Sequence, residues 1–587
     1  MNPSEPPFWP YCAHGADPAV DPVGCRGIHV PGHTACLAHL TGSDRDAYLG
    51  TLIPGADVNH SGTPFTHGLL HDLLKAVRDP TTGRPHLGFA DFSEAQFEDA
   101  GFSRVLFSGP AWFSWAQFSG STWFDSVQFS SDAVFGRARF QDANFAGTWF
   151  ASGAAFTRAQ FSDHAMFGLA QFSADTDFEE VSFSRLANFG STHFSGNVRF
   201  KGVRFEGAPE IGPLWCTGTV VLSMAAFTLP VTLQLAAREV VAVRTRWEST
   251  ATIRLRYATL DLSHAVLSAP MAVIHATTPF TDSYGASWLA DAEQALSGSD
   301  SVRVISVQGV DAAHLVLTDT DLTDCLFSGA FHLDQLRLEG RTAFAIPPTG
   351  WLRRGLWPVR WTRRRALAEE HHWRAQSSDQ PVPDPGGPSQ RQWRPGPHHP
   401  DPARTPDPED VAALYRQLRK ALEDGKNEPG AADFYYGECE MRRHDSTGTP
   451  PGERRLLWGY WLLSGYGLRA SRAFGWLITA MFLTVLLLMR FGMPTHEPDP
   501  ATTGTLEGQR ISLHTSTPAP ALRGGWREHF TAARAEKATR VAINSVVFRS
   551  SGQNLTTVGT YIEMASRLLE PTLLALGVLA IRGRIKR

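Results

Sequence analysis

The sequence predicts a mainly β fold, a four-sided β-helix of short repeats, followed by an α-helical hairpin and C-terminal transmembrane helices. Three observations lead to this prediction. Phenylalanine recurs every five or six residues between Phe92 and Phe205, two amphipathic segments follow a proline-rich stretch, and a 17-residue segment without a charge begins at Ala473. A chain of 587 residues has room for about three or four structural units.

The phenylalanine register predicts the β-helix. Its intervals of five and six residues do not fit a helical period, and the residue two places before each phenylalanine is Ala, Thr or Val. Two inward positions around one outward residue are strand alternation, and four such sides give about 20–22 residues per turn. The phenylalanines chosen to represent the predicted core are Phe92, Phe97, Phe102, Phe140, Phe145, Phe150, Phe161, Phe172, Phe183 and Phe194.

Segments such as Ala90-Asp91-Phe92 and Ala143-Asn144-Phe145 combine a small and a large inward residue. This pattern resembles the pentapeptide-repeat family, in particular its actinobacterial, membrane-associated members. The resemblance implies a right-handed quadrilateral β-helix. A second repeat block is expected around Leu317, Leu322 and Phe327, after a degenerate stretch and an inserted loop at 270–300. Cys216 and Cys325 are then core thiols.

The remaining composition sets the expected domain boundaries. These are 1–40 (Cys/His-rich segment), 41–86 (helical cap), 87–210 (β-helix), 211–345 (degenerate and second repeat block), 346–376 (Trp/Arg-rich segment), 377–409 (Pro-rich linker), 410–446 (helical hairpin), 454–493 (interfacial and first transmembrane helix), 494–560 (loop with a pore-like motif) and 561–587 (second transmembrane helix and basic tail).

The cap and the segment before it carry two predictions. Ser43 or Asp44 can begin a helix whose apolar stripe covers the first coil, because an open β-helix end exposes unpaired strand edges. Three cysteines and several histidines precede this helix, but no CxxC pair occurs. Two interpretations therefore remain open, a structural zinc site or loop cysteines without a ligand. The candidate zinc ligands are Cys12, Cys25, Cys36 and His39.

Between the β-helix and the first span, the Trp/Arg-rich segment suits either a headgroup layer or a packed helix. The hairpin is predicted as helices over 411–424 and 431–443, and its Glu438 and Glu440 are assigned to ordinary salt bridges.

Two apolar segments predict a multi-pass protein of the cytoplasmic membrane. The arginines before Ala473 and the basic residues after Ile581 both favour the cytoplasmic side, which also places the N-terminal domain in the cytoplasm. The second segment is short and contains Glu570 and Pro571, so its crossing is less well defined.

A motif before the second span resembles the filter signature Thr-Thr-Val-Gly-Tyr-Gly of two-helix potassium channels. Its tyrosine comes one place late and its second glycine is absent, which indicates a degenerate pore region. The residues concerned are Thr556, Thr557, Val558, Gly559 and Tyr561.

The function expected from these features is non-enzymatic. With 54 basic and 58 acidic residues, no nucleic-acid partner is expected. No phosphate-binding glycine loop, zinc-protease motif or nucleophile elbow occurs. The leading hypothesis is a membrane-anchored scaffold for an unidentified protein partner, with homo-oligomers possible. The alternatives are an ion channel-like or sensory membrane protein and, from DNA-mimicking members of the resembled family, a gyrase-binding protein.

Overall fold

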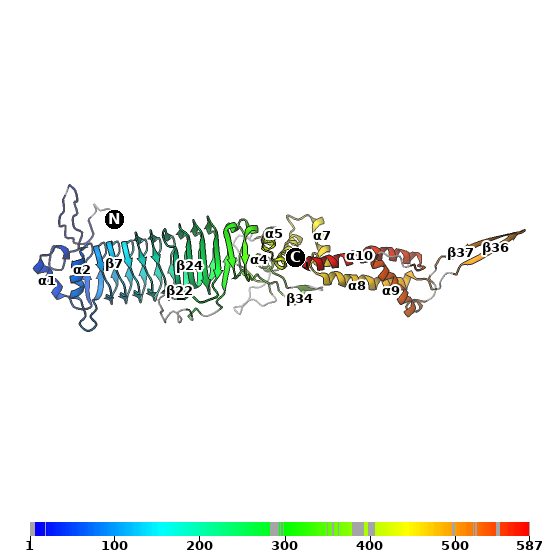
Figure 1. Ribbon diagram of the computed structural model, residues 1–587, viewed down its shortest axis with the longest axis horizontal. Helices are drawn as coiled ribbons and strands as arrows, with labels where there is room; N and C mark the ends of the chain where they lie inside the picture. Colours follow the sequence, from blue (N-terminus) through cyan, green and yellow to red (C-terminus); the bar gives the residue numbers. More distant parts are fainter. Residues whose placement is uncertain are drawn as a thin grey trace. The chain divides into compact units, whose positions relative to one another are not determined.

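The computed structural model forms two compact units (Figure 1). The first contains residues 1–406 and 420–426, and the second contains residues 407–419 and 427–587. The structure describes residues 6–17, 19–281, 293, 295–296, 299–348, 350–354, 357–361, 363–378, 392–396, 406–495, 499–520, 522, 525–547 and 552–585.

A parallel β-solenoid of about 11 turns dominates the first unit. Its strands belong to two sheets. The larger sheet contains β1 (Ala56–Asn59), β3 (His86–Asp91), β5 (Leu106–Phe107), β6 (Ala111–Trp112), β8 (Gln128–Phe129), β9 (Ala133–Val134), β11 (Trp149–Phe150), β12 (Ala154–Ala155), β15 (Gln171–Phe172), β16 (Thr176–Asp177), β19 (Thr192–Phe194), β20 (Val198–Arg199), β22 (Glu210–Val221), β24 (Val231–Val241), β26 (Ala251–Arg256), β27 (Thr259–Asp261), β29 (Met271–His275), β30 (Val302–Ser306), β31 (Leu315–Thr318), β32 (Thr320–Asp321) and β33 (Arg337–Glu339). The other contains β2 (Pro64–Phe65), β4 (Gln96–Gly101), β7 (Gln117–Trp123), β10 (Arg139–Asn144), β13 (Gln160–Phe161), β14 (Ala165–Met166), β17 (Ser182–Phe183), β18 (Ala187–Asn188), β21 (Arg204–Phe205), β23 (Ala226–Phe227), β25 (Arg246–Trp247) and β28 (Val266–Leu267).

The interior of the solenoid is built from stacked phenylalanine rings, as the register predicts. Rings 21 or 22 residues apart lie nearly parallel with centroids 4.6–5.3 Å apart. The stacks are Phe92, Phe113, Phe135, Phe156, Phe178 and Phe200; Phe97, Phe118, Phe140, Phe161, Phe183 and Phe205; Phe102, Phe124, Phe145, Phe167 and Phe189; and Phe107, Phe129, Phe150, Phe172 and Phe194. All of these side chains are buried. Within each stack, a ring therefore contacts the equivalent ring of the neighbouring coil.

The solenoid is longer than the register indicates. At its start β1 and β2 pair with β3 and β4, so part of the predicted helical cap is the first coil. Beyond residue 210 the second sheet continues to β28 and the larger sheet continues to β33, because Leu, Val and Trp take most of the interior positions. Leu317, Leu322 and Phe327 are buried as predicted, and so are Cys216 and Cys325.

The predicted insertion at 270–300 is shorter than expected. Met271–His275 forms β29, which pairs with β26 and β31. Residues 282–292, 294, 297 and 298 of that prediction lie outside the described part of the chain.

The N-terminal cap contains two helices and not one. α1 (Gly42–Thr51) is capped by Thr41, so neither Ser43 nor Asp44 is the capping residue, and α2 (His67–Ala76) is capped by Thr66. The predicted apolar stripe lies on α2, where Leu69, Leu70, Leu73 and Leu74 are buried. A further 3₁₀ turn, η1 (Leu37–His39), precedes α1.

Helix α4 (Ala368–Ser377) lies against the last coils. Its Glu369 accepts hydrogen bonds from the backbone amides of Phe327 (2.5 Å) and Ser328 (3.1 Å). These amides would otherwise lack a partner at the end of the solenoid, so Glu369 acts as its C-terminal cap. The rest of this region contains η2 (Ala312–His314), η3 (Leu333–Gln335) and an antiparallel hairpin of β34 (Gly350–Arg354) and β35 (Trp357–Trp361).

This cap should make stability depend on pH. Burial raises the pKa of Glu369 to about 7 from 4.5. Between pH 4.5 and 7 only the unfolded carboxyl ionises, so the free energy of unfolding should fall by about 3 kcal/mol as pH rises through this window. In denaturant unfolding, Glu369→Gln should lose this pH dependence because glutamine does not ionise. Its amide oxygen can still accept both backbone hydrogen bonds, so the cap itself should be kept. Replacing the exposed Glu339 of β33 with Gln should leave the slope unchanged; an equal slope in Glu369→Gln would contradict the assignment.

The predicted Trp/Arg-rich segment is thus a β-hairpin followed by a packed helix, and the side chains of the hairpin lie outside the described residues. Most of the predicted linker lies outside them as well. Within it, residues 392–396 are described, and Trp393 is buried beside His371 of α4.

The second unit is helical. It contains α5 (Pro408–Asp424, shared with the first unit), α6 (Glu428–His444), α7 (Pro451–Ser464), α8 (Ala470–Leu487), the π-helical turn η5 (Leu488–Gly492), β36 (Ala501–Glu507), β37 (Arg510–Ser516), η6 (Trp526–His529), α9 (Ala532–Val546) and α10 (Thr557–Ile585). The predicted helical hairpin is formed by α5 and α6. Two helical segments are long and apolar enough to cross a membrane, Ala470–Gly492 and Thr557–Arg582.

Candidate functional site

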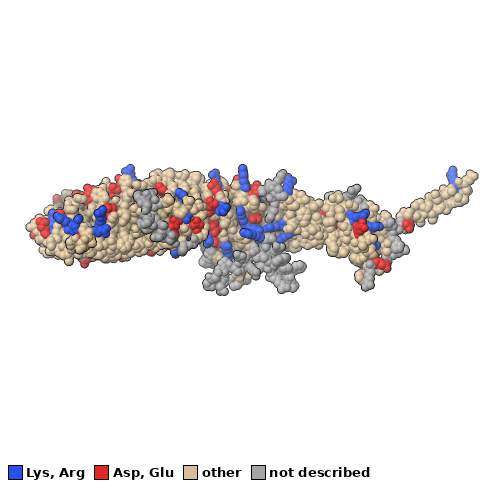
Figure 2. All heavy atoms as spheres, turned by 60° about the horizontal axis from the view of Figure 1, so that its bottom comes forward, with Lys and Arg blue, Asp and Glu red and all other residues tan. Residues whose placement is uncertain are grey.

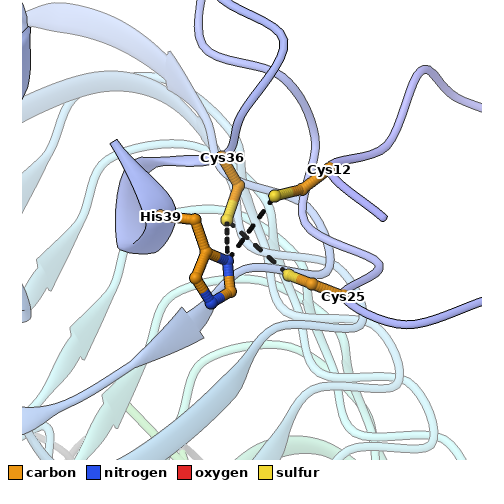
Figure 3. A group of neighbouring side chains, drawn as sticks. All are labelled: Cys12, Cys25, Cys36 and His39. Carbon is orange, nitrogen blue, oxygen red and sulfur yellow. Dashed lines mark hydrogen bonds between the residues drawn. The ribbon is translucent and has the colours of Figure 1, made fainter. Parts of the chain in front are cut away.

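The predicted metal ligands come together at the N-terminal end of the chain. The sulfurs of Cys12, Cys25 and Cys36 and a ring nitrogen of His39 all lie within 4.8 Å of one another (Figure 3). The Cys25 and Cys36 sulfurs are 3.7 Å apart, and His39 Nδ1 lies 3.5 Å from the Cys12 sulfur and 3.3 Å from the Cys36 sulfur. The structure therefore forms a Cys₃His cluster from residues spread over 28 positions.

Short backbone interactions hold these residues in place. The Cys12 amide donates to the Gly27 carbonyl, and the Gly27 amide donates to the Cys25 sulfur at 3.5 Å. Cys36 precedes η1, and one turn of that helix brings His39 to the same point. Gly27 is required here, because a Cβ atom would lie 2.6 Å from the Cys36 Cβ.

The cluster contains acidic sulfur. The Cys36 thiol hydrogen-bonds to Cys25 and lowers the pKa of Cys25 to about 5, whereas this bond and burial raise the pKa of Cys36. Thiolate sulfur is the form that binds metals. The ring of His14 stacks on His39 with centroids 4.1 Å apart.

A cavity of about 620 Å³ adjoins the cluster. The segment that carries Cys25 and Arg26 lines one part of it, and Glu94, Gln96 and Trp115 of the first solenoid coils line another. Arg26 forms an ion pair with Glu94 at 3.3 Å, which ties the cysteine-rich segment to the solenoid.

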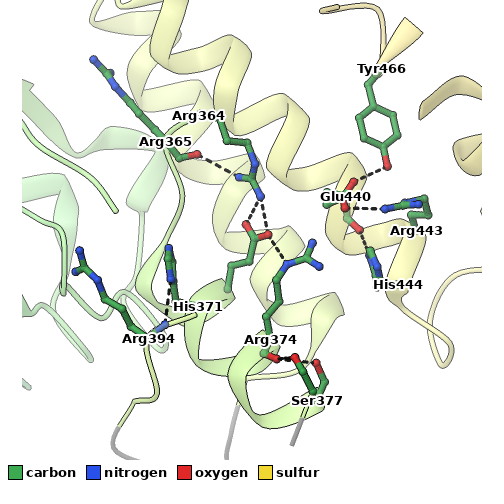
Figure 4. A network of polar contacts seen from close by, with 12 residues as sticks. Arg364, Arg365, His371, Arg374, Ser377, Arg394, Glu440, Arg443, His444 and Tyr466 are labelled. Carbon is green, nitrogen blue, oxygen red and sulfur yellow. Dashed lines mark hydrogen bonds and ion pairs between the residues drawn. The ribbon is translucent and has the colours of Figure 1, made fainter. Parts of the chain in front are cut away.

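Two networks of buried carboxylates are structural (Figure 4). In the first unit Glu370 is held between Arg364 (2.5 Å) and Arg374 (2.8 Å). In the second unit Glu440 accepts from Arg443 (2.6 Å) and from the Tyr466 hydroxyl (3.0 Å). Glu438 pairs with Arg416 at 2.9 Å, so the salt-bridge predictions for Glu438 and Glu440 are confirmed.

Helices α8 and α10 pack as an antiparallel pair. Three close approaches define the pairing: Phe474 with Gly577, Thr484 with Glu570, and Gly492 with Gly559. As the residue number rises along α8, it falls along α10. At about 1.5 Å per residue, the 23- and 26-residue apolar segments are roughly 35 and 39 Å long, more than the ~30 Å of a bilayer core.

Glu570, one of the two acidic residues of the second segment, is hidden between the helices. Glu570 is fully buried, and one of its carboxylate oxygens accepts a hydrogen bond from the Thr484 hydroxyl at 2.9 Å. This location resolves the difficulty that the sequence raises, because the side chain faces α8 and not the outer surface of the pair.

The filter-like motif does not form an extended filter in this structure. Thr557, Val558, Gly559 and Tyr561 lie in the first turns of α10, and the Thr556 hydroxyl caps the helix by accepting from the Gly559 amide. The Thr556 hydroxyl also donates to the Phe491 carbonyl at 2.7 Å. In a helix the backbone carbonyls are directed along the axis toward amides, so they do not ring an ion path as filter carbonyls do.

Gly559 has a packing role at this position. A Cβ atom on it would lie 2.3 Å from the Gly492 carbonyl oxygen and 2.7 Å from the Gly492 Cα. The two glycines thus allow η5, which continues α8, and the beginning of α10 to touch through their backbones, as small residues do at close helix crossings.

The sequence reasoning missed helix α9 within the predicted loop 494–560. Ala538 and Val541 of α9 pack against Leu488, Met489 and Met493. Arg534 donates hydrogen bonds to the carbonyls of Met489, Met493 and Pro494. These bonds satisfy backbone carbonyls at the C-terminal end of the first apolar segment. The spacing of Ala535, Ala538, Val541, Ala542 and Ser545 is helical, although small residues make this signal weak.

Comparison with known proteins identifies the repeats. Residues 92–139 and 102–149 match the family model described as pentapeptide repeats (9 copies). No curated protein and no solved structure matches the chain.

Proposed function

We propose that this pentapeptide-repeat protein is a membrane-anchored scaffold without catalytic activity. In this proposal the α8–α10 pair crosses the cytoplasmic membrane twice, and the solenoid displays its outer surface to a protein partner in the cytoplasm. The exposed apolar surface of the helix pair is the observation that carries the proposal.

That surface is unsuited to water. Ile478 and Phe482 on α8, and Leu568 and Val578 on α10, are each more than half exposed. Figure 2 shows a stretch of the helix pair without charged side chains on the face that it presents. Water-exposed apolar area costs roughly 25 cal/mol per Å², so a lipid environment is the physical alternative to aggregation.

Charge distribution supports the orientation. Arg469 and Arg472 lie at the beginning of α8, and Arg582 lies near the end of α10. Because the helices are antiparallel, these positions share one side of the membrane, and an excess of arginine favours the cytoplasmic side. Residues 499–520, which contain the β36–β37 hairpin, are then outside.

The solenoid suits recognition. Its interior positions are taken by stacked rings, so its outward side chains are under no packing constraint from the register and can vary with the partner. Exposed tryptophans such as Trp112, Trp123 and Trp149 offer the large, rigid side chains that interfaces favour.

Cysteine labelling in intact cells tests the anchor and its orientation. The six native cysteines all precede α8, the last being Cys439. A membrane-impermeant maleimide should therefore leave the wild-type chain unlabelled. It should label Ser512→Cys, because Ser512 of β37 is exposed. The labelled chain should sediment with membranes and should be released only by detergent.

Permeabilised cells provide the control, since native thiols should then react. Recovery of the chain in the soluble fraction would disprove the anchor. Labelling of the wild-type chain in intact cells, with Ser512→Cys adding nothing, would reverse the proposed orientation.

A further inference from the structure

We infer that Cys12, Cys25, Cys36 and His39 form a structural Zn²⁺ site that fastens the N-terminal segment to the first coils of the solenoid. This site does not depend on the repeat pattern or on the solenoid acting as a scaffold, and it shares with the proposed function only the cytoplasmic location of the N-terminal unit. It rests on the donor set, on the distances between donor atoms and on the weakness of the segment without it.

The donor set matches structural zinc. Three thiolates and one imidazole are a Cys₃His set, one of the common tetrahedral zinc sets in proteins. All four donors come from this segment of the chain, and no CxxC pair contributes. An oxygen ligand for a hard cation such as Mg²⁺ is not part of the set.

The distances match as well. In a tetrahedron with Zn–S of about 2.3 Å and Zn–N of about 2.0–2.1 Å, two sulfurs lie ~3.8 Å apart and sulfur lies ~3.6 Å from nitrogen. Three of the six donor pairs lie close to these values: the Cys25 and Cys36 sulfurs are 3.7 Å apart, and His39 Nδ1 lies 3.5 Å from the Cys12 sulfur and 3.3 Å from the Cys36 sulfur. The other pairs lie within 4.8 Å, so metal binding requires a small contraction of the cluster. The Gly27 amide near the Cys25 sulfur supplies the kind of outer hydrogen bond that stabilises a bound thiolate.

The segment itself needs a fastening. Within the described residues 6–40, regular structure is limited to η1 and isolated bridges such as Tyr11 with Ile28. Fewer than about 40 residues rarely form a stable core without a metal or a disulfide. The chain carries its cysteines as free thiols, and a metal is the crosslink that a reducing cytoplasm permits.

Metal binding would also build the cavity beside the cluster. Cys25 belongs to both, the adjacent Arg26 lines the cavity, and the Ile28 amide donates to the Ser61 carbonyl of the first coil at 2.8 Å. Loss of the ion should therefore release the cysteine-rich wall of the cavity while the phenylalanine-filled coils stay intact.

The test uses the full chain purified in detergent under reducing conditions. Elemental analysis should find one zinc per chain, and replacement by Co²⁺ should give the intense visible bands of a tetrahedral site with thiolate charge transfer. Cys12→Ser and His39→Ala should each lose most of the zinc or change the cobalt spectrum. Cys439→Ala, which removes a thiol from α6, should retain both signals.

Limited proteolysis keeps the inference testable if a ligand variant binds poorly for other reasons. Chelation of the wild-type chain should speed cleavage within residues 13–24 at least tenfold, with the β-sheet circular dichroism unchanged. Absence of zinc and of a cobalt spectrum in the reduced chain would overturn the inference, as would a Cys25–Cys36 disulfide in the chain isolated from cytoplasm.

Discussion

Replacing Phe135 with alanine is expected to destabilise the solenoid by about 3–5 kcal/mol, the usual cost of deleting a fully buried aromatic side chain. Phe135 is fully buried, and its ring stacks between Phe113 (5.0 Å) and Phe156 (4.8 Å). Phe124, Phe129 and Phe145 also pack against it at 5.4–5.9 Å, so the side chains around the cavity are themselves held in ring stacks and have little freedom to fill it.

Denaturant unfolding combined with hydrogen exchange should locate this loss in the coils around residue 135, since each coil contacts only its neighbours. Trp123→Ala is the matched control, because it deletes a larger ring that points outward and is 39% exposed. The control should cost less than about 1 kcal/mol. Equal effects of the two substitutions would show that the stacked rings do not dominate stability.

Replacing Gly559 with valine is expected to separate the beginning of α10 from η5, which continues α8, and to lower the stability of the helix pair sharply. The new Cβ would overlap the Gly492 backbone, which cannot move aside as a flexible side chain can. The helices would have to part at this crossing, and the Thr556 hydrogen bond to Phe491 would be lost with it.

Gly475→Val is the matched control for this experiment. Gly475 lies in α8, in the same apolar segment, and has no atom within 4 Å of the position of a Cβ. Protease resistance and thermal stability in detergent should fall sharply for Gly559→Val and stay near wild type for Gly475→Val. If Gly559→Val were as stable as the control, the packing role of Gly559 would be contradicted. An extended conformation of residues 556–561 would then have to be considered again.

The sequence predicts the solenoid well because its information is local and repeated. One aromatic residue and one small residue in each short side determine which side chains face inward. Every coil of the phenylalanine-rich part repeats this pattern. The short strands β1 and β2 precede the first regular repeat, so the register does not reveal them. The sequence therefore predicts a helical cap where the first coil lies. Beyond residue 210, leucine and valine fill the same interior, and the register fades although the fold continues.

The candidate sites were predictable to different degrees. Residue type and proximity in sequence suffice to select Cys12, Cys25, Cys36 and His39, but only the fold determines whether four donors can share one ion. The filter resemblance depends on six residues and carries no information on backbone conformation. In the structure, position 559 requires glycine because the backbone there touches the backbone of Gly492. Gly492 lies 67 residues earlier in the chain, so no local sequence pattern reveals this contact.

The stacked rings also imply a rule for how this protein can change in length over evolution. Each complete coil advances the column by one strand spacing of about 4.8 Å. A coil uses 21 or 22 residues where phenylalanine fills the interior and 20 residues between β23 and β28. Duplication or loss of that many residues leaves every ring opposite an equivalent ring, whereas a shift of two or three residues places polar side chains inside. The length of the solenoid can therefore change only in whole coils, and the outer surface of one coil stays the same when others are added or lost.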